Sequence, residues 1–76
     1  MDVKSYYRIY TESWKFFRKY AEQLPLSDGQ WNKACREMID ICEQHKDDTA
    51  KFVSGIMYQT MNELERCDKA AKIAEM

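Results

Sequence analysis

The segment YYRIYTESWKFFRKY, residues 6–20, decides the fold, because it holds seven of the ten aromatic side chains in this 76-residue chain. Apolar residues in and around it recur at alternating intervals of four and three positions: Val3, Tyr7, Tyr10, Trp14, Phe17, Ala21 and Leu24. This is the spacing of one helix face, whereas a half-buried strand would alternate every second residue. Pro25 ends the pattern, since the residue before a proline is pushed out of helical geometry. The sequence therefore predicts a first helix over about residues 2–24, with this stripe facing a core.

The apolar arc of this helix is wider than the stripe alone. At about 100° per residue, Ile9, Phe16 and Tyr20 fall on one flank of the stripe, and the whole apolar arc spans about 180°. The opposite half carries the cations Lys4, Arg8, Lys15, Arg18 and Lys19. A helix with two neighbours in a bundle buries a wide face, so we expect the stripe to be core and the flank to be half covered.

The segment LPLSDGQW, residues 24–31, predicts the start of a second helix. Ser27 and Gln30 form an S-x-x-Q capping box, in which each side chain satisfies a backbone N–H near the other. Leu26 and Trp31 stand at the two positions of a hydrophobic staple. We expect this helix over about residues 28–45, with an apolar face made of Trp31, Ala34, Cys35, Met38, Ile41 and Cys42.

The segment EQHKDDTAK, residues 43–51, has no large apolar residue and predicts a turn at about 45–48. Asp47 and Asp48 disfavour a helix C-terminus but stabilise the N-terminus of a new helix. The predicted fold is all-α, an antiparallel three-helix bundle in a single helical domain, residues 1–76. One unbroken helix after the capping box is the alternative, and it would give a helical hairpin that dimerises into a four-helix bundle.

The third helix is expected over about residues 48–74. Its apolar face is made of Val53, Ile56, Met57, Thr60, Leu64, Cys67, Ala71 and Ala74. Glu65 with Lys69 and Asp68 with Lys72 are expected to form exposed ion pairs one turn apart. Gly55 lies away from the apolar face of this helix, where it either accommodates the backbone of a partner or is a tolerated weak point.

Composition argues against several classes of protein. The chain has 12 basic and 13 acidic residues and a net charge of −1, which argues against binding nucleic acid by charge alone. It has neither an apolar run long enough to span a membrane nor the pattern of a secretory leader. Three cysteines without a framework of close spacings fit a reducing compartment. We expect a cytoplasmic protein.

The residues that could carry chemistry do not combine into a site. Cys35, Cys42, His45 and Cys67 are zinc-ligand types, but Cys35 lies about 10 Å along its helix from Cys42, and no C-x-x-C motif exists. His45, the single histidine, is expected at an exposed helix end. There is no glycine-rich phosphate loop, and the carboxylates fall on surface positions. We expect no metal, no cofactor, no small-molecule substrate and no enzymatic activity.

The excess of apolar area predicts a protein that works through protein–protein contacts, because exposed apolar clusters mark association surfaces. We expect Ile9, Phe16 and Tyr20 to form the docking surface, with Tyr58 and Met61 as a second candidate patch. The protein is interpreted as a small adaptor, regulator or inhibitor that binds a protein partner or a second copy of itself, the latter as a homodimer. The alternative is a nucleic-acid accessory protein that uses the basic face of the first helix: Lys4, Arg8, Lys15 and Lys19.

The segment YYRIYTESWKFFRKY followed by the capped SDGQW resembles small uncharacterised all-helical proteins of bacterial genomes and their mobile elements. The resemblance covers the N-terminal half of the chain. Such proteins have no assigned activity, so the resemblance implies no functional residue. It implies a bacterial cytoplasmic accessory protein.

Overall fold

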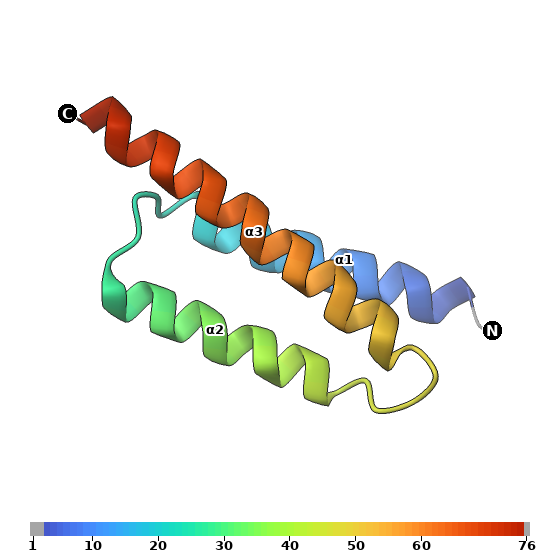
Figure 1. Ribbon diagram of the computed structural model, residues 1–76. Coiled ribbons are helices and arrows are strands. Elements are labelled where there is room, and N and C mark those ends of the chain that lie inside the picture. Colours follow the sequence, from blue (N-terminus) through green and yellow to red (C-terminus); the bar gives the residue numbers. More distant parts are fainter. Residues whose placement is uncertain (1–2, 76) are drawn as a thin grey trace.

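Three α-helices make up the computed structural model, which describes residues 3–75: α1 (Val3–Ala21), α2 (Asp28–Glu43) and α3 (Ala50–Glu75). The helices run up, down and up, so that α1 and α3 are parallel and α2 is antiparallel to both (Figure 1). α3 packs against α1 and against α2. The chain is therefore an all-α three-helix bundle, and the predicted fold class is confirmed.

α1 ends at Ala21, three residues before the predicted limit of 24. The backbone N–H of Gln23 turns back to the carbonyl of Tyr20 at 3.0 Å, and the Gln23 side-chain amide donates to the Lys19 carbonyl at 3.0 Å. These bonds satisfy carbonyls of the last turn without further helix. Pro25 still limits the helix, because it restricts the residue before it.

The capping box at the start of α2 is confirmed. The Ser27 hydroxyl accepts from the Gln30 N–H at 3.3 Å, and the Gln30 side-chain oxygen accepts from the Ser27 N–H at 2.7 Å. Leu26 is buried and Trp31 packs against the core as a half-buried side chain. The box fixes where α2 begins and sets the direction in which it leaves the first turn.

A six-residue connection, 44–49, separates α2 from α3, so the alternative of one unbroken second helix is wrong. The Asp47 carboxylate accepts from the backbone N–H of Thr49 at 2.9 Å, immediately before α3 begins at Ala50. This bond satisfies one backbone donor near the start of α3 and so stabilises a fresh helix start. The turn falls where the aspartates predict it.

The core is formed mainly by residues of α1 and α3. Its fully buried apolar members are Ile9, Phe16, Tyr20, Leu26, Ala34, Val53, Met57 and Leu64. The predicted apolar face of α3 is confirmed at Val53, Met57 and Leu64. On α1 the expectation was wrong for the centre of the core, because the buried residues are those of the flank, while only Phe17, Ala21 and Leu24 of the stripe pack against it as half-buried side chains.

Ser13 explains why α1 turns its flank inward. Ile9, Ser13, Phe16 and Tyr20 repeat at intervals of four, three and four, which is also a helix-face spacing, and all four are buried. The Ser13 hydroxyl donates to the Ile9 carbonyl at 2.8 Å and lies 3.5 Å from the Met57 sulfur. Since its hydrogen bond is satisfied within the helix, this small polar side chain can be buried against α3.

The bundle exposes more surface than a compact protein of its size. Its accessible surface is 5551 Å², whereas a compact monomer of 9.1 kDa has roughly 4,900 Å². Its radius of gyration is 13.4 Å, against about 11 Å for a compact domain of this length. The C-terminal part of α3 projects past the first turn, which accounts for part of this extension (Figure 1).

Candidate protein-binding face

The first four residues of the stripe predicted to be core lie on the surface of α1, whereas Phe17, Ala21 and Leu24 are half-buried against the core. Val3, Tyr7, Tyr10 and Trp14 are 80%, 73%, 57% and 58% exposed, and we call these four residues the aromatic face. At about 100° per residue they are centred about 120° around α1 from the buried residues. Three large aromatic side chains therefore lie on one side of one helix with more than half of each exposed to water.

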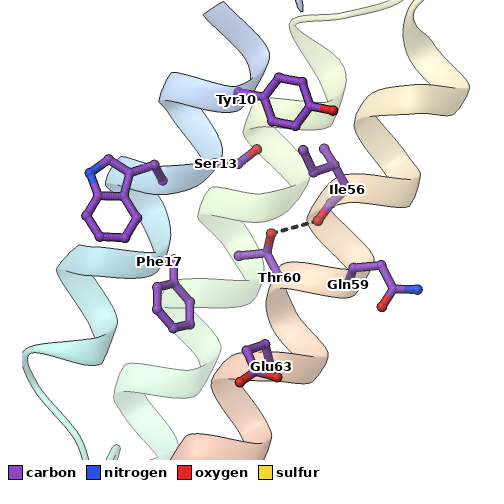
Figure 2. Close-up of a pocket in the computed structure, with 8 residues that line it drawn as sticks. Tyr10, Ser13, Phe17, Ile56, Gln59, Thr60 and Glu63 are labelled. Carbon is purple, nitrogen blue, oxygen red and sulfur yellow. Dashed lines mark hydrogen bonds between the residues drawn. The ribbon is translucent and has the colours of Figure 1, made fainter. Parts of the chain in front are cut away.

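A groove adjoins the aromatic face, and its walls come from α1 and α3 alone. The groove has a volume of about 360 Å³ and is lined by Tyr10, Ser13, Trp14, Phe17, Ile56, Gln59, Thr60 and Glu63. Figure 2 shows Tyr10 and Phe17 projecting from α1 on one side, with Ile56, Gln59 and Glu63 on the α3 side. The indole of Trp14 and the ring of Phe17 stack with centroids 6.5 Å apart, so α1 supplies a continuous aromatic wall.

The groove continues toward the start of α3. A second hollow is lined by Tyr10, Lys51, Phe52, Gly55, Ile56 and Gln59 and shares three of these residues with the first. We call the two hollows together the α1/α3 groove. Phe52 contacts the ring of Tyr10 edge-on, with centroids 5.5 Å apart, and so joins the two helices at this end. From Lys51 to Glu63 the groove follows α3 for about 18 Å, at 1.5 Å per residue.

The polar groups on the groove floor are already satisfied. The Thr60 hydroxyl donates to the Ile56 carbonyl at 2.7 Å, as Figure 2 marks, and the Ser13 hydroxyl donates to the Ile9 carbonyl. Both bonds are made within their own helices. Neither hydroxyl therefore has a hydrogen left to donate to a molecule that lies in the groove.

The two ends of the groove differ in charge. Lys51 lies at the end nearer the start of α3, is exposed and forms no ion pair within the described residues. Glu63 lies at the other end, where the Arg66 guanidinium donates to both of its oxygens. Arg66 holds the pKa of Glu63 below its ordinary value, so this carboxylate is ionised at neutral pH. The groove is thus cationic at one end and carries an acid–base pair at the other.

The residues predicted to form the docking surface lie elsewhere. Ile9, Phe16 and Tyr20 are 1%, 3% and 1% exposed, so the expectation that they are half covered is wrong. They cannot contact a partner while the bundle is folded. Met61 is half-buried against the core and lines a different hollow, between α2 and α3. Tyr58 is exposed but lies about 160° around α3 from Ile56, outside the groove.

Arg8 and Lys19, both predicted for the nucleic-acid alternative, are bound to carboxylates. Arg8 Nε lies 3.0 Å from a Glu12 oxygen, and Lys19 Nζ lies 2.6 Å from a Glu37 oxygen. Lys15 is exposed and, like Lys19, lines a polar hollow that also contains Arg18 and Glu22. These carboxylates reduce the positive potential that a phosphate backbone would meet on this side of α1.

His45, expected at an exposed helix end, is buried in the connection between α2 and α3. Its Nε2 lies 3.2 Å from the Glu12 carboxylate, which ties this connection to α1. Cys35, Cys42 and Cys67 are free thiols. Among residues 3–75 no group of three or more histidines, cysteines and acids is arranged to hold a metal ion. In the same residues no helix is both long and apolar enough to cross a membrane.

Comparison with protein-family models, with curated proteins and with solved structures found no match to this chain. The resemblance to small helical proteins of bacterial genomes therefore stays a prediction.

Proposed function

We propose that this protein acts without catalysis, by binding an amphipathic helix in the α1/α3 groove, as a small adaptor, regulator or inhibitor. The observation that carries the proposal is the aromatic face, exposed beside an apolar groove. Monomeric proteins rarely leave large contiguous apolar patches open unless those patches bind something.

The area available is sufficient for a measurable complex. At roughly 150–250 Å² for each aromatic side chain, the exposed fractions of Tyr7, Tyr10 and Trp14 leave on the order of 400 Å² open to water. Covering this area is worth on the order of 10 kcal/mol at about 25 cal/mol per Å². Association costs an estimated 4–15 kcal/mol. Covering the aromatic residues therefore offsets about this cost, and contacts with the groove walls must supply the net binding free energy.

The chemistry of the groove favours a helix as its occupant. An extended peptide needs hydrogen-bond partners for its backbone, whereas a helix satisfies its own. The floor hydroxyls of Ser13 and Thr60 donate their hydrogens within their own helices, so neither has a hydrogen left to donate to a carbonyl of a peptide backbone. A helix that inserts apolar side chains between Trp14 and Ile56 meets these conditions.

The setting proposed for this activity is the cytoplasm of a bacterium. The three free thiols support a reducing compartment. The bacterial part of the proposal rests only on the resemblance of the N-terminal half to small bacterial helical proteins.

Site-specific photo-cross-linking in cells that produce the chain tests the proposed function. A benzophenone amino acid replaces Tyr10 in one variant. In the control it replaces Tyr58, which is at least as exposed but lies outside the groove. We expect a discrete cross-linked species from position 10 that the control lacks and that disappears when Trp14→Glu is added. No cross-link from position 10, or the same species from both positions, contradicts the proposal.

A further inference from the structure

We infer that the helix occupying the α1/α3 groove is α1 of a second copy of this chain, which makes the protein a two-fold symmetric dimer. This inference rests on the proposed function and names the partner. The aromatic face is itself the exposed stripe of an amphipathic helix, with Tyr7, Tyr10 and Trp14 on the apolar side. The chain therefore carries both the groove and a helix of the kind that the groove accepts.

The aromatic face and the α1/α3 groove share residues, so two copies can each place the aromatic face in the groove of the other. Tyr10 and Trp14 belong to both, since they form the crest of the aromatic face and one wall of the groove. In a two-fold symmetric interface the same surface of both copies is in contact, so the aromatic face of each copy can enter the α1/α3 groove of the other. The result is a layer of four helices, α1 and α3 from each copy, of the kind that packs in four-helix bundles.

The exposed area matches what such a dimer buries. A standard interface removes roughly 800 Å² from each partner. Tyr7, Tyr10 and Trp14 supply about half of this, and the adjoining Val3 with the groove walls at Phe52 and Ile56 adds apolar surface.

Gly55 allows the second copy to come close. A Cβ built on Gly55 meets no atom within 4 Å, and the residue lies in the part of the groove between Lys51 and Gln59. A glycine at this exposed point of α3 leaves the backbone open to a crossing helix. The same residue weakens the isolated helix, so its position in the groove is consistent with a contact made between copies.

Sedimentation equilibrium on the purified full chain tests the inference, from about 5 to about 500 µM to bracket a micromolar dimer. We expect the mass to rise with concentration from 9.1 kDa to twice that value. Trp14→Glu should raise the dimer dissociation constant more than about 30-fold, as expected for a central anchor, while Tyr58→Glu leaves it unchanged. Tyr10→Glu serves as the second groove variant if circular dichroism shows that Trp14→Glu has lost helix.

Equal loss of association in Trp14→Glu and Tyr58→Glu overturns the choice of face.

Different results contradict the dimer and the proposed function. A chain that stays monomeric at every concentration, yet cross-links a different protein from position 10, overturns the dimer and leaves the proposed function standing. A monomer with no position-specific cross-link overturns both.

Discussion

The Asp68 carboxylate accepts a hydrogen bond from the backbone N–H of Leu26 at 2.7 Å and so binds the turn between α1 and α2 to the C-terminal third of α3. Asp68 is 3% exposed, and its other oxygen lies 2.9 Å from Lys72 Nζ. The Lys72 ammonium, with help from the Leu26 N–H, holds the pKa of Asp68 below its ordinary value. One carboxylate thus fixes the turn that sets the direction of α2.

Replacing Asp68 should destabilise the fold according to how much of this contact is lost. Asp68→Ala leaves the buried Leu26 N–H without a partner, at a cost of about 1–3 kcal/mol. Asp68→Asn keeps an acceptor and should cost less. Urea unfolding at pH 7 measures both variants, and equal stability of Asp68→Ala and the wild type would contradict the contact.

Acid should remove the contribution of Asp68. Its folded pKa is lower than its unfolded pKa of about 4, so protonation favours the unfolded chain. The stabilisation is therefore intact above about pH 4 and is lost as the pH falls through the folded pKa. The stability gap between the wild type and Asp68→Asn should narrow between pH 7 and pH 3, and a gap that stays constant would argue against a depressed pKa.

Phe16 and Trp14 should respond in opposite ways to truncation, although they are two residues apart on α1. Phe16 is buried against Tyr20, with ring centroids 5.2 Å apart, whereas most of Trp14 is in water. Phe16→Ala should cost about 3–5 kcal/mol, a large part of the roughly 4–11 kcal/mol expected for a domain of this length. Trp14→Ala should cost less than about 1 kcal/mol in a dilute monomer, because surface substitutions rarely cost more.

Chemical denaturation at low protein concentration measures this pair. Similar losses in the two variants would mean that α1 is rotated differently from the arrangement described. The sequence alone predicts the other rotation, with Phe16 half covered and Trp14 in the core, so this experiment separates the two rotations directly.

Tyr20 should resist alkaline titration. Burial, together with the nearby Glu37 carboxylate, raises the pKa of Tyr20 to about 12. Because the folded pKa exceeds the unfolded value of about 10, stability is intact below about pH 10 and falls as the pH rises toward 12. Absorbance at the tyrosinate band, compared between the wild type and Tyr20→Phe, should show one tyrosine that ionises last.

The Tyr20→Phe variant also tests the state of the buried hydroxyl. This oxygen lies close to Glu37 but makes no hydrogen bond of acceptable geometry. A buried hydroxyl without a partner is unfavourable, so Tyr20→Phe should keep or raise stability at pH 7 by up to about 1 kcal/mol. A loss larger than this would show that the hydroxyl is bonded in solution.

Gly55→Ala should act in opposite directions on folding and on association. Its new Cβ meets nothing within the chain, so the monomer should gain about 0.5–1 kcal/mol from the better helix former. If a second copy lies over Gly55, the same methyl group should weaken the dimer. Unfolding at low concentration and sedimentation at high concentration measure the two effects, and a gain in both would remove Gly55 from the interface.

Much of the fold is predictable because its signals are local. The capping box of Ser27 and Gln30 involves side chains three residues apart, and the turn before α3 follows from Asp47 and its neighbour. Few polar residues interrupt the apolar spacing of α3, so this spacing indicates a single buried face. These features give the helix count and the fold class.

The rotation of α1 is not predictable in the same way, because two stripes with the same spacing run along it. One contains Tyr10 and Trp14, and the other contains Ile9 and Phe16 with Ser13 between them. A serine in a predicted core position counts against its stripe, yet its hydroxyl is satisfied by the Ile9 carbonyl and its small size admits Met57. The candidate face was therefore misplaced by about a third of a turn.

The sequence also does not predict which polar residues are buried against partners far away along the chain. Asp68 has the spacing of an exposed ion pair with Lys72, and that pair exists, but nothing local indicates that Leu26 lies against it. His45 pairs with Glu12 across 33 positions of sequence. Such contacts depend on how the helices pack, which no short segment encodes.

Acrylamide quenching of Trp14 fluorescence, in a Trp31→Phe variant that leaves one tryptophan, tests the central claim most directly. We expect strong quenching in dilute protein, because Trp14 is 58% exposed, and progressive protection as the concentration rises and the second copy covers the aromatic face. Protection at every concentration would place Trp14 in the core, and unchanged quenching across the range would leave the face uncovered. Either result would contradict the account.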